Sequence, residues 1–172
     1  QHRLSEKALF DELEIPVAPY KAVDSLESLS AAVAELGLPI VLKTATGGYD
    51  GKGQFVLRSE QQIEQAWAEL GPAGSLIAES FVTFSREVSI IAVRGQNGDV
   101  KTWPLPENHH HHGILSHSIV PAPNSADLQP VAQDYITRLL NHLNYVGVLT
   151  LELFVTDKGL YANEMAPRVH NS

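Results

Sequence analysis

Apolar and polar residues alternate along this chain in two rhythms, one typical of helices and one typical of strands. Apolar residues recur at helical spacing in several stretches, which predicts helices over 4–13, 25–36, 59–70 and 127–144. On the last of these helices, the stripe expected to be buried is Leu128, Val131, Tyr135, Leu139 and Leu143. On the first helix, Lys7 is expected to point outward.

Shorter apolar runs, bounded by glycine, proline and polar turns, predict strands. These runs cover 38–43, 54–57, 75–81, 87–94, 100–105, 114–120, 147–154 and 160–166. The polar segment 107–113 is expected to interrupt them. Helices and strands alternate early in the chain, whereas the later part is mostly hairpins with one covering helix. This mixture predicts an α+β protein with two lobes.

The composition excludes several classes of protein. A chain of 172 residues with 44% apolar content can bury a core. The formal net charge is −8, with 12 Lys and Arg against 20 Asp and Glu, so no basic stripe is present to bind a nucleic acid. The absence of cysteine excludes disulfides, thiolate catalysis and cysteine-ligated zinc. No apolar run is long enough for a membrane span, and the cytoplasm is the expected compartment.

Both ends of the chain look cut. It begins at Gln1, enters a helical pattern at once and stops at Ser172 inside a polar cluster. We therefore expect a fragment of a longer protein.

A glycine-rich segment runs from Lys43 to Gln54 between two apolar runs. Its glycines let backbone N–H groups approach an anion closely, and Lys43 and Lys52 add positive charge, as in a flexible lid over phosphates. The spacing fits neither the P-loop nor the dinucleotide fingerprint. The alternative is a long glycine-rich hairpin that binds no ligand.

Glu152 lies inside the apolar run 148–154, where a carboxylate needs compensation. If 157–159 form a three-residue turn, Thr156 faces Leu160 and Glu152 faces Glu164. Two opposed carboxylates repel, and Mg²⁺ would resolve the conflict. The alternative is that one carboxylate points to solvent. A polar cluster follows on the same strand and beyond it: Asn163, Arg168, His170 and Asn171.

Glu79 and Glu87 form a second acidic pair, on strands that follow the third helix. Glu79 precedes the apolar residues Phe81 and Val82, a strand edge that suits a flat adenine ring, whose amino group could donate to the carboxylate. Glu87 could accept from ribose hydroxyls. Alternatively, both are ordinary charges at strand ends.

Two long segments resemble one protein family. The run 46–54, Thr-Gly-Gly-Tyr-Asp-Gly-Lys-Gly-Gln, and the run 163–172, Asn-Glu-Met-Ala-Pro-Arg-Val-His-Asn-Ser, are similar to signatures of the ATP-grasp superfamily and, within it, of the N5-carboxyaminoimidazole ribonucleotide synthetases. The resemblance implies an α+β ATP-grasp fold, in which two lobes clamp ATP, truncated at both ends. It implies a connector helix over 1–14, a small lid subdomain over 15–78 with its glycine-rich loop at 44–54, and a large subdomain over 79–172.

The resemblance also assigns roles to residues. Glu79 would face the adenine amino group beside the backbone of Phe81 and Val82, and Glu87 would hold the ribose. Arg3 and Lys43 would touch the nucleotide phosphates. The lid over the phosphates would be formed by Gly48, Tyr49, Asp50, Gly51, Lys52 and Gln54.

Glu152 and Glu164 would carry Mg²⁺ with help from Asn163. Arg168, His170 and Asn171 would lie where bicarbonate meets 5-aminoimidazole ribonucleotide, and Lys52 would also act in catalysis. These assignments follow from the resemblance.

The four histidines 109–112 lie within a segment that resembles the family's Asn-x-His-x-x-Gly-Ile-Leu motif, and His110 occupies the position of its histidine. His110 is therefore a candidate neighbour of the substrate. A purification tag or a separate metal site is the alternative.

The implied activity is the carboxylation of 5-aminoimidazole ribonucleotide through carboxyphosphate, with ATP, bicarbonate and Mg²⁺, in purine biosynthesis. The implied whole protein is a homodimer that acts on small molecules, and the fragment alone is expected to be inactive. Other readings are a different ATP-grasp carboxylate–amine ligase, a nucleotide-binding module without catalysis, or a histidine-rich metal-binding protein.

Overall fold

The computed structural model describes residues 2–48 and 52–169. The chain divides into two compact units: unit 1 comprises Gln1–Ala8 and Ala18–Val82, and unit 2 comprises Leu9–Val17 and Thr83–Ser172. The division after Val82 lies beyond the expected boundary at 78, so Glu79, Phe81 and Val82 belong to unit 1. The first helix, α1 (Arg3–Glu12), has residues in both units and is not a separate connector over 1–14.

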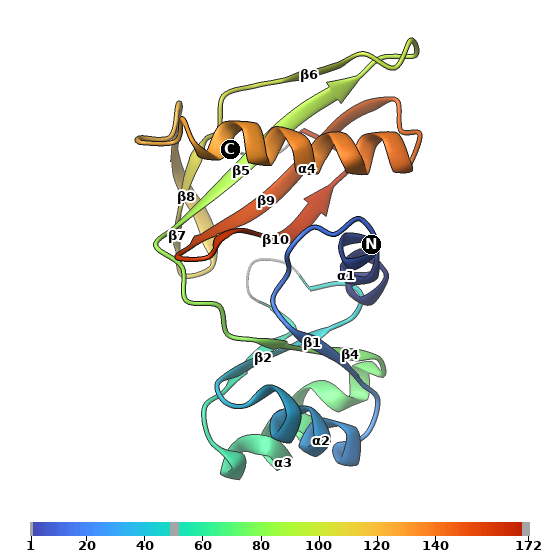
Figure 1. Cartoon of the computed structure of the whole chain (residues 1–172). Helices are drawn as coiled ribbons and strands as arrows, with labels where there is room; N and C mark the ends of the chain where they lie inside the picture. The colour runs from blue at the N-terminus through green and yellow to red at the C-terminus, as the bar shows by residue number, and fades with distance from the viewer. Residues whose placement is uncertain (1, 49–51, 170–172) are drawn as a thin grey trace. The chain divides into compact units, whose positions relative to one another are not determined.

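Unit 1 is built on a four-stranded antiparallel sheet whose strands lie in the order β1-β4-β2-β3. Helices α2 and α3 cover one face of this sheet (Figure 1), and their buried side chains pack on Ile40, Leu42 and Leu57. The strands are β1 (Tyr20–Val23), β2 (Ile40–Thr44), β3 (Gln54–Leu57) and β4 (Leu76–Ser80). The helices are α2 (Leu26–Leu36), α3 (Ile63–Leu70) and the short turns η1 (Glu60–Gln62) and η2 (Gly71–Ala73).

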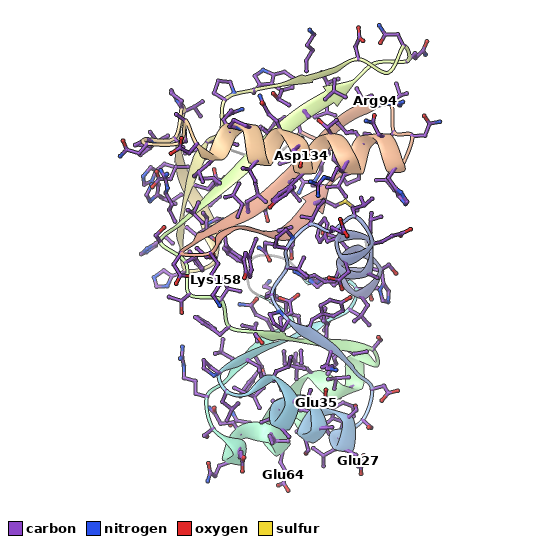
Figure 2. The ribbon with its side chains drawn as sticks, viewed as in Figure 1. Glu27, Glu35, Glu64, Arg94, Asp134 and Lys158 are labelled. Atoms are coloured by element: carbon purple, nitrogen blue, oxygen red, sulfur yellow. The ribbon has the colours of Figure 1, made fainter. Side chains whose placement is uncertain are left out.

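Local sequence fixes the ends of α2. Ser25 is the N-cap, and its hydroxyl accepts a hydrogen bond from the Ser28 N–H while the Ser28 side chain accepts from the Ser25 N–H. Gly37 ends the helix with φ 75°, a conformation that glycine adopts without strain. On the outer side of these helices, Glu27 of α2 and Glu64 of α3 project away from the sheet (Figure 2). The predicted end at Leu36 is confirmed, and the helix begins at Leu26, one residue after the predicted start at Ser25.

Unit 2 contains a six-stranded sheet in the order β10-β9-β5-β7-β8, with β6 paired to β5. Helix α4 lies along one face (Figure 1), and its core side chains meet Phe10 and Ile15 from the N-terminal segment of this unit. The elements are β5 (Arg86–Arg94), β6 (Val100–Thr102), β7 (Glu107–His111), β8 (Ile114–Ile119), α4 (Leu128–His142), β9 (Gly147–Thr156) and β10 (Gly159–Ala166).

One prediction about unit 2 was wrong, and another is confirmed only in part. The polar segment 107–113 contains strand β7, because pairing with β5 and β8 supplies its backbone hydrogen bonds and its side chains border a polar cavity. Of the predicted stripe, Leu139 is buried and Leu128 and Tyr135 pack partly buried against the core, whereas Val131 of α4 and Leu143 just beyond it are 39% and 43% exposed. The buried residues of α4 are Ala132, Ile136, Leu139 and Leu140. The packing of α4 on the sheet determines which of its apolar side chains are buried.

Within the described part of the chain, no helix has the length and apolar character needed to cross a membrane.

Candidate functional site

Glu152 and Glu164 stand opposite each other on the hairpin β9–β10, as the sequence predicted. The path to that pairing differs from the prediction in two ways. The turn is shorter, so Thr156 pairs with Gly159 rather than with Leu160, and the register then shifts between Ala162 and Glu164. The shift leaves Asn163 as the extra residue of a bulge. The two differences cancel, and the carboxylates meet at opposed positions.

A cavity of about 60 Å³ in unit 2 brings several predicted residues together. Glu87 from β5, His110 from β7, Glu152 from β9 and Asn163 from β10 all line it. Buried Asn108 also lines this cavity.

Asn108 was not predicted from the sequence as a site residue. Its amide donates to the Ser89 hydroxyl at 3.2 Å and accepts from the Ser118 hydroxyl at 2.8 Å, so the two neighbouring strands β5 and β8 hold it. Asn108 is the first letter of the Asn-x-His motif, which is the signal that could have identified it.

The donor atoms on the β9–β10 hairpin fit Mg²⁺. Glu152, Glu164 and Asn163 offer carboxylate and amide oxygens, and Mg²⁺ is typically held by one or two carboxylates together with waters and phosphate oxygens. Among the residues that the structure describes, no three or more His, Cys, Asp and Glu side chains are grouped to hold a metal ion by themselves. A site on this hairpin therefore needs oxygen ligands from a bound phosphate or water.

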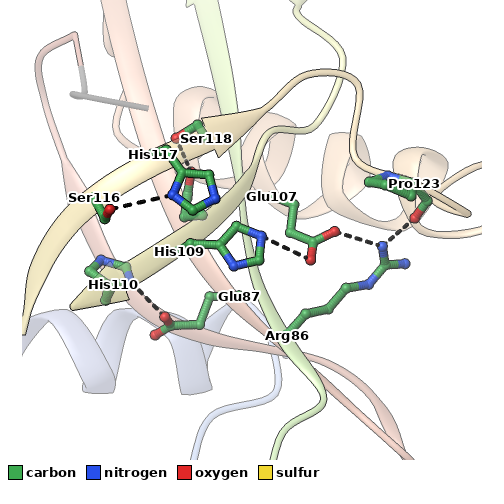
Figure 3. A network of polar contacts seen from close by, with 10 residues as sticks. Arg86, Glu87, Glu107, His109, His110, Ser116, His117, Ser118 and Pro123 are labelled. Carbon is green, nitrogen blue, oxygen red and sulfur yellow. Dashed lines mark hydrogen bonds and ion pairs between the residues drawn. The ribbon is translucent and has the colours of Figure 1, made fainter.

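The histidine run does not form a metal cluster, although all four of its residues are described. His109 stacks on His117 with ring centroids 4.6 Å apart, and its Nε2 lies 3.3 Å from Oε1 of Glu107, which also contacts Arg86 (Figure 3). His110 turns instead to Glu87, with Nδ1 2.6 Å from Oε2. Successive histidines thus reach different partners, and the reading of a dedicated histidine metal site is wrong for this arrangement.

In unit 1, Glu79 is buried between two lysines. Lys43 Nζ lies 2.9 Å from Glu79 Oε2, and Lys7 Nζ lies 3.5 Å from Oε1. Burial by itself would raise the pKa of Glu79, but the two ammonium charges and their hydrogen bonds outweigh it and leave this pKa below its ordinary value. Lys7, expected to point outward, is only 3% exposed, because Glu79 compensates its charge.

The neighbours of Glu79 partly match the expected adenine edge. Phe81 is exposed, and the guanidinium carbon of Arg58 lies 5.7 Å from the centroid of its ring. The Phe81 N–H donates to the Pro39 carbonyl at 3.2 Å. The Phe81 carbonyl and the backbone of Val82 remain candidates for the adenine edge.

The base of the glycine-rich loop is an antiparallel pair in which Lys43 faces Gln54. Arg3, expected on the phosphates, donates from Nη1 to the carbonyls of Thr44 at 2.9 Å and Gly47 at 2.6 Å. Gly48 has φ 73°, and a Cβ there would lie 2.7 Å from the Lys52 carbonyl oxygen. Tyr49, Asp50 and Gly51 lie outside the described residues.

Thr44 is a residue that sequence analysis missed. Its Oγ1 is buried at the foot of the loop and has no hydrogen-bond partner among the described residues. It would lie 3.0 Å from a Cβ at Gly53 and 3.3 Å from one at Gly48, so glycines at these positions keep space open around this hydroxyl. Thr44 directly follows Lys43, and this position at the end of an apolar strand was the available signal.

Arg168 lies just beyond β10 and is exposed. Its carbonyl accepts from the Thr150 hydroxyl at 3.2 Å, which ties the segment to β9. Arg168 does not line the 60 Å³ cavity. His170 and Asn171 are not among the residues that the structure describes.

Comparison with known proteins identifies the family of this chain. The model of the ATP-grasp domain matches residues 8–172, so the chain belongs to the ATP-grasp family, and the predicted α+β ATP-grasp fold is confirmed. Within that family it is similar to the N5-carboxyaminoimidazole ribonucleotide synthase of Pseudomonas aeruginosa, at 49% identity over 99% of this chain and 46% of the relative.

Solved structures agree with this similarity. The ADP complex of an N5-carboxyaminoimidazole ribonucleotide synthetase superposes with a TM-score of 0.93 at 46% identity, over 99% of this chain and 45% of that one. The synthase of Aspergillus clavatus in complex with ADP and 5-aminoimidazole ribonucleotide gives a TM-score of 0.86 at 25% identity, with coverage of 99% and 45%. The chain spans about half the length of the curated relatives that it matches.

Proposed function

We propose that these residues form the ATP-grasp part of an N5-carboxyaminoimidazole ribonucleotide synthase, which carboxylates 5-aminoimidazole ribonucleotide with ATP and bicarbonate. The observation that carries this proposal is the pairing of Glu152 with Glu164 in a chain 49% identical, over 99% of its length, to a protein of that name. The opposed carboxylates would hold Mg²⁺ for phosphoryl transfer, and the similarity to the relative indicates 5-aminoimidazole ribonucleotide as the acceptor.

The reaction is two transfers in sequence. Bicarbonate oxygen attacks the γ-phosphorus of ATP and displaces ADP, which forms carboxyphosphate. The amine of 5-aminoimidazole ribonucleotide then attacks the carboxyl carbon and displaces phosphate, and loss of a proton from nitrogen gives the carbamate. Phosphoryl transfer needs positioning and charge neutralisation more than covalent catalysis, so the chain's task is to hold charges in place.

Unit 1 supplies groups for the base and the phosphates. The Glu79 carboxylate, held by Lys7 and Lys43, keeps lone pairs that can accept from the adenine amino group. The Lys43 ammonium has three N–H donors, so its contact with Glu79 leaves others for phosphate oxygens. Arg3 fastens the foot of the loop, and Thr44 Oγ1, Gly48, Lys52 and Gln54 are the groups near that foot that could meet phosphate oxygens.

Unit 2 supplies the ribose and metal ligands. Glu87 accepts from ribose hydroxyls, and Glu152, Glu164 and Asn163 would hold Mg²⁺. A bound Mg²⁺ supplies positive charge for the phosphate oxygens. Asn108, fixed by Ser89 and Ser118, gives the cavity a rigid polar wall.

The acceptor would be held at the end of β10. The Arg168 guanidinium presents a fork of donors that suits a bicarbonate or phosphate oxygen. His170 and Asn171, and Tyr49, Asp50 and Gly51 of the lid, complete the proposed set. A closed lid would exclude water from the site. This would protect carboxyphosphate, which hydrolyses readily.

The whole protein is proposed to act as a cytoplasmic homodimer on small molecules, since ATP and a ribonucleotide are cytoplasmic metabolites. A nucleic-acid partner does not fit the net charge of −8. The ATP-grasp part alone is proposed to be inactive, since the relatives are about twice as long.

The test is ADP release by the whole protein. We expect release that requires both bicarbonate and 5-aminoimidazole ribonucleotide and stops when either is omitted. Equal release with an unrelated carboxylate and amine would instead identify another ATP-grasp ligase. ATP binding without turnover under any combination would identify a nucleotide-binding module.

A further inference from the structure

His110 and Glu87 are in direct contact in the cavity of unit 2, where the nucleotide ribose is proposed to bind. Nδ1 of His110 lies 2.6 Å from Oε2 of Glu87, and both side chains are partly exposed to the cavity. An ionised carboxylate can only accept hydrogen bonds, so Nδ1 carries the proton in this contact. One oxygen of Glu87 is thereby held by a donor from the neighbouring strand.

The sheet register explains why one histidine of the run reaches Glu87. Glu87 pairs with Asn108 across β5 and β7, and His110 lies two residues further along β7 on the same face. Such diagonal neighbours are about 7–8 Å apart at Cα, within reach of a histidine and a glutamate side chain. His109, between them, faces the other way and stacks on His117 (Figure 3).

We propose that His110 is a positioning residue that orients Glu87 so that its other oxygen, Oε1, accepts from the 2′-hydroxyl of the nucleotide ribose. This inference rests on the proposed function, in which Glu87 is the ribose acceptor. Without His110, the Glu87 side chain can rotate, and its ordering has to be supplied by nucleotide binding.

His110 therefore sets the preference for a ribonucleotide over a 2′-deoxyribonucleotide. If His110 had a merely structural role, replacing it would weaken the binding of both nucleotides equally, because both have the same base and phosphates and depend on the same protein fold. If His110 acts through Glu87, replacing it weakens the binding of ATP more than that of 2′-deoxyATP. Only ATP carries the 2′-hydroxyl whose contact with Glu87 would be lost.

The test compares kcat and KM for ATP and 2′-deoxyATP in the whole protein. We expect His110→Leu to raise the KM for ATP about tenfold with kcat changed less than about threefold, and to reduce the preference for ATP by a similar factor. His110→Asn, whose amide N–H can take the place of Nδ1–H, should keep most of the preference. His111→Leu is the matched control, because exposed His111 does not line the cavity.

An unchanged preference for ATP in His110→Leu, or equal behaviour of the Leu and Asn variants, would overturn the inference. Thermal unfolding of each variant identifies any loss of fold. Calorimetric binding of ADP and 2′-deoxyADP measures the same preference without turnover. The proposed activity can therefore fail, as absent carboxylation in the unaltered protein, while the binding preference still decides the role of His110.

Discussion

Lys7 and Glu79 form an ion pair inside unit 1, with Nζ 3.5 Å from Oε1, and Lys43 binds the other oxygen of the same carboxylate. Both members of the pair are nearly inaccessible to solvent, at 3% and 5% exposure. A buried charge is costly unless another charge compensates it, and Glu79 compensates both lysines. The shared carboxylate also orients Lys43, the lysine assigned to the nucleotide phosphates.

Replacing Glu79 should therefore destabilise unit 1. In Glu79→Gln, two ammonium groups lose a carboxylate partner, and we expect the free energy of unfolding in urea to fall by about 3 kcal/mol. The matched control is Glu35→Gln, which removes the exposed Lys21–Glu35 ion pair and should change stability by less than about 1 kcal/mol. Equal effects of the two substitutions would contradict the role given to burial.

The pH dependence of stability should change in the same variant. The folded-state pKa of Glu79 lies below the ordinary value of 4.5, so its contribution is present above that pH and is lost as the pH falls towards the folded pKa. Between about pH 6 and pH 3, the unaltered chain should lose more stability than Glu79→Gln. Urea titrations at several pH values measure this difference, and parallel curves would show that Glu79 does not titrate as described.

Glu164→Gln should separate metal binding from folding. Removing one of two opposed carboxylates relieves repulsion, so without Mg²⁺ the variant should be as stable as the unaltered protein or more stable by about 0.5 kcal/mol. The rise in melting temperature with Mg²⁺ and nucleotide should be lost. In the whole protein, kcat should fall at least about 100-fold, or about 2.7 kcal/mol. Asp157→Asn, in the exposed turn of the same hairpin, should retain both properties.

Gly47 and Gly48 offer a matched pair at the foot of the loop. Both have positive φ, at 68° and 73°, so alanine at either position is strained by about 1 kcal/mol. A Cβ at Gly48 would also meet the Lys52 carbonyl oxygen at 2.7 Å, whereas at Gly47 nothing lies within 4 Å. We expect Gly48→Ala to lower the melting temperature more than Gly47→Ala, and it should also weaken nucleotide binding more. The reverse order would contradict the described loop geometry.

Helix α4 provides a test of which stripe is buried. Ile136 is fully buried, whereas Val131 is 39% exposed. Ile136→Ala should destabilise unit 2 by about 2–5 kcal/mol through lost packing and a residual cavity, and Val131→Ala should change stability by no more than about 0.5 kcal/mol. Urea unfolding measures both, and a larger effect at Val131 would restore the stripe expected from sequence.

The sequence by itself determined the features that depend on neighbouring residues. The ends of α2 follow from Ser25 and Gly37, and strand β3 was predicted over its observed bounds, 54–57. The opposition of Glu152 and Glu164 was also predicted, because a hairpin brings the two strands on either side of a turn together. The predicted turn was one residue too long, and the extra residue at Asn163 was not predicted. Because the two errors are equal in size, they cancel, and Glu152 still pairs with Glu164.

The tertiary structure decided the features that depend on distant segments. Lys7 is buried because Glu79 of β4 lies beside it, β7 is a strand because β5 and β8 supply its hydrogen bonds, and α4 buries the stripe that fits the sheet. Asn108 and His110 join the cavity through the register of β5 and β7. Helix and strand periodicity cannot specify these partners, because burial, charge compensation and register are properties of the packed chain rather than of any one segment.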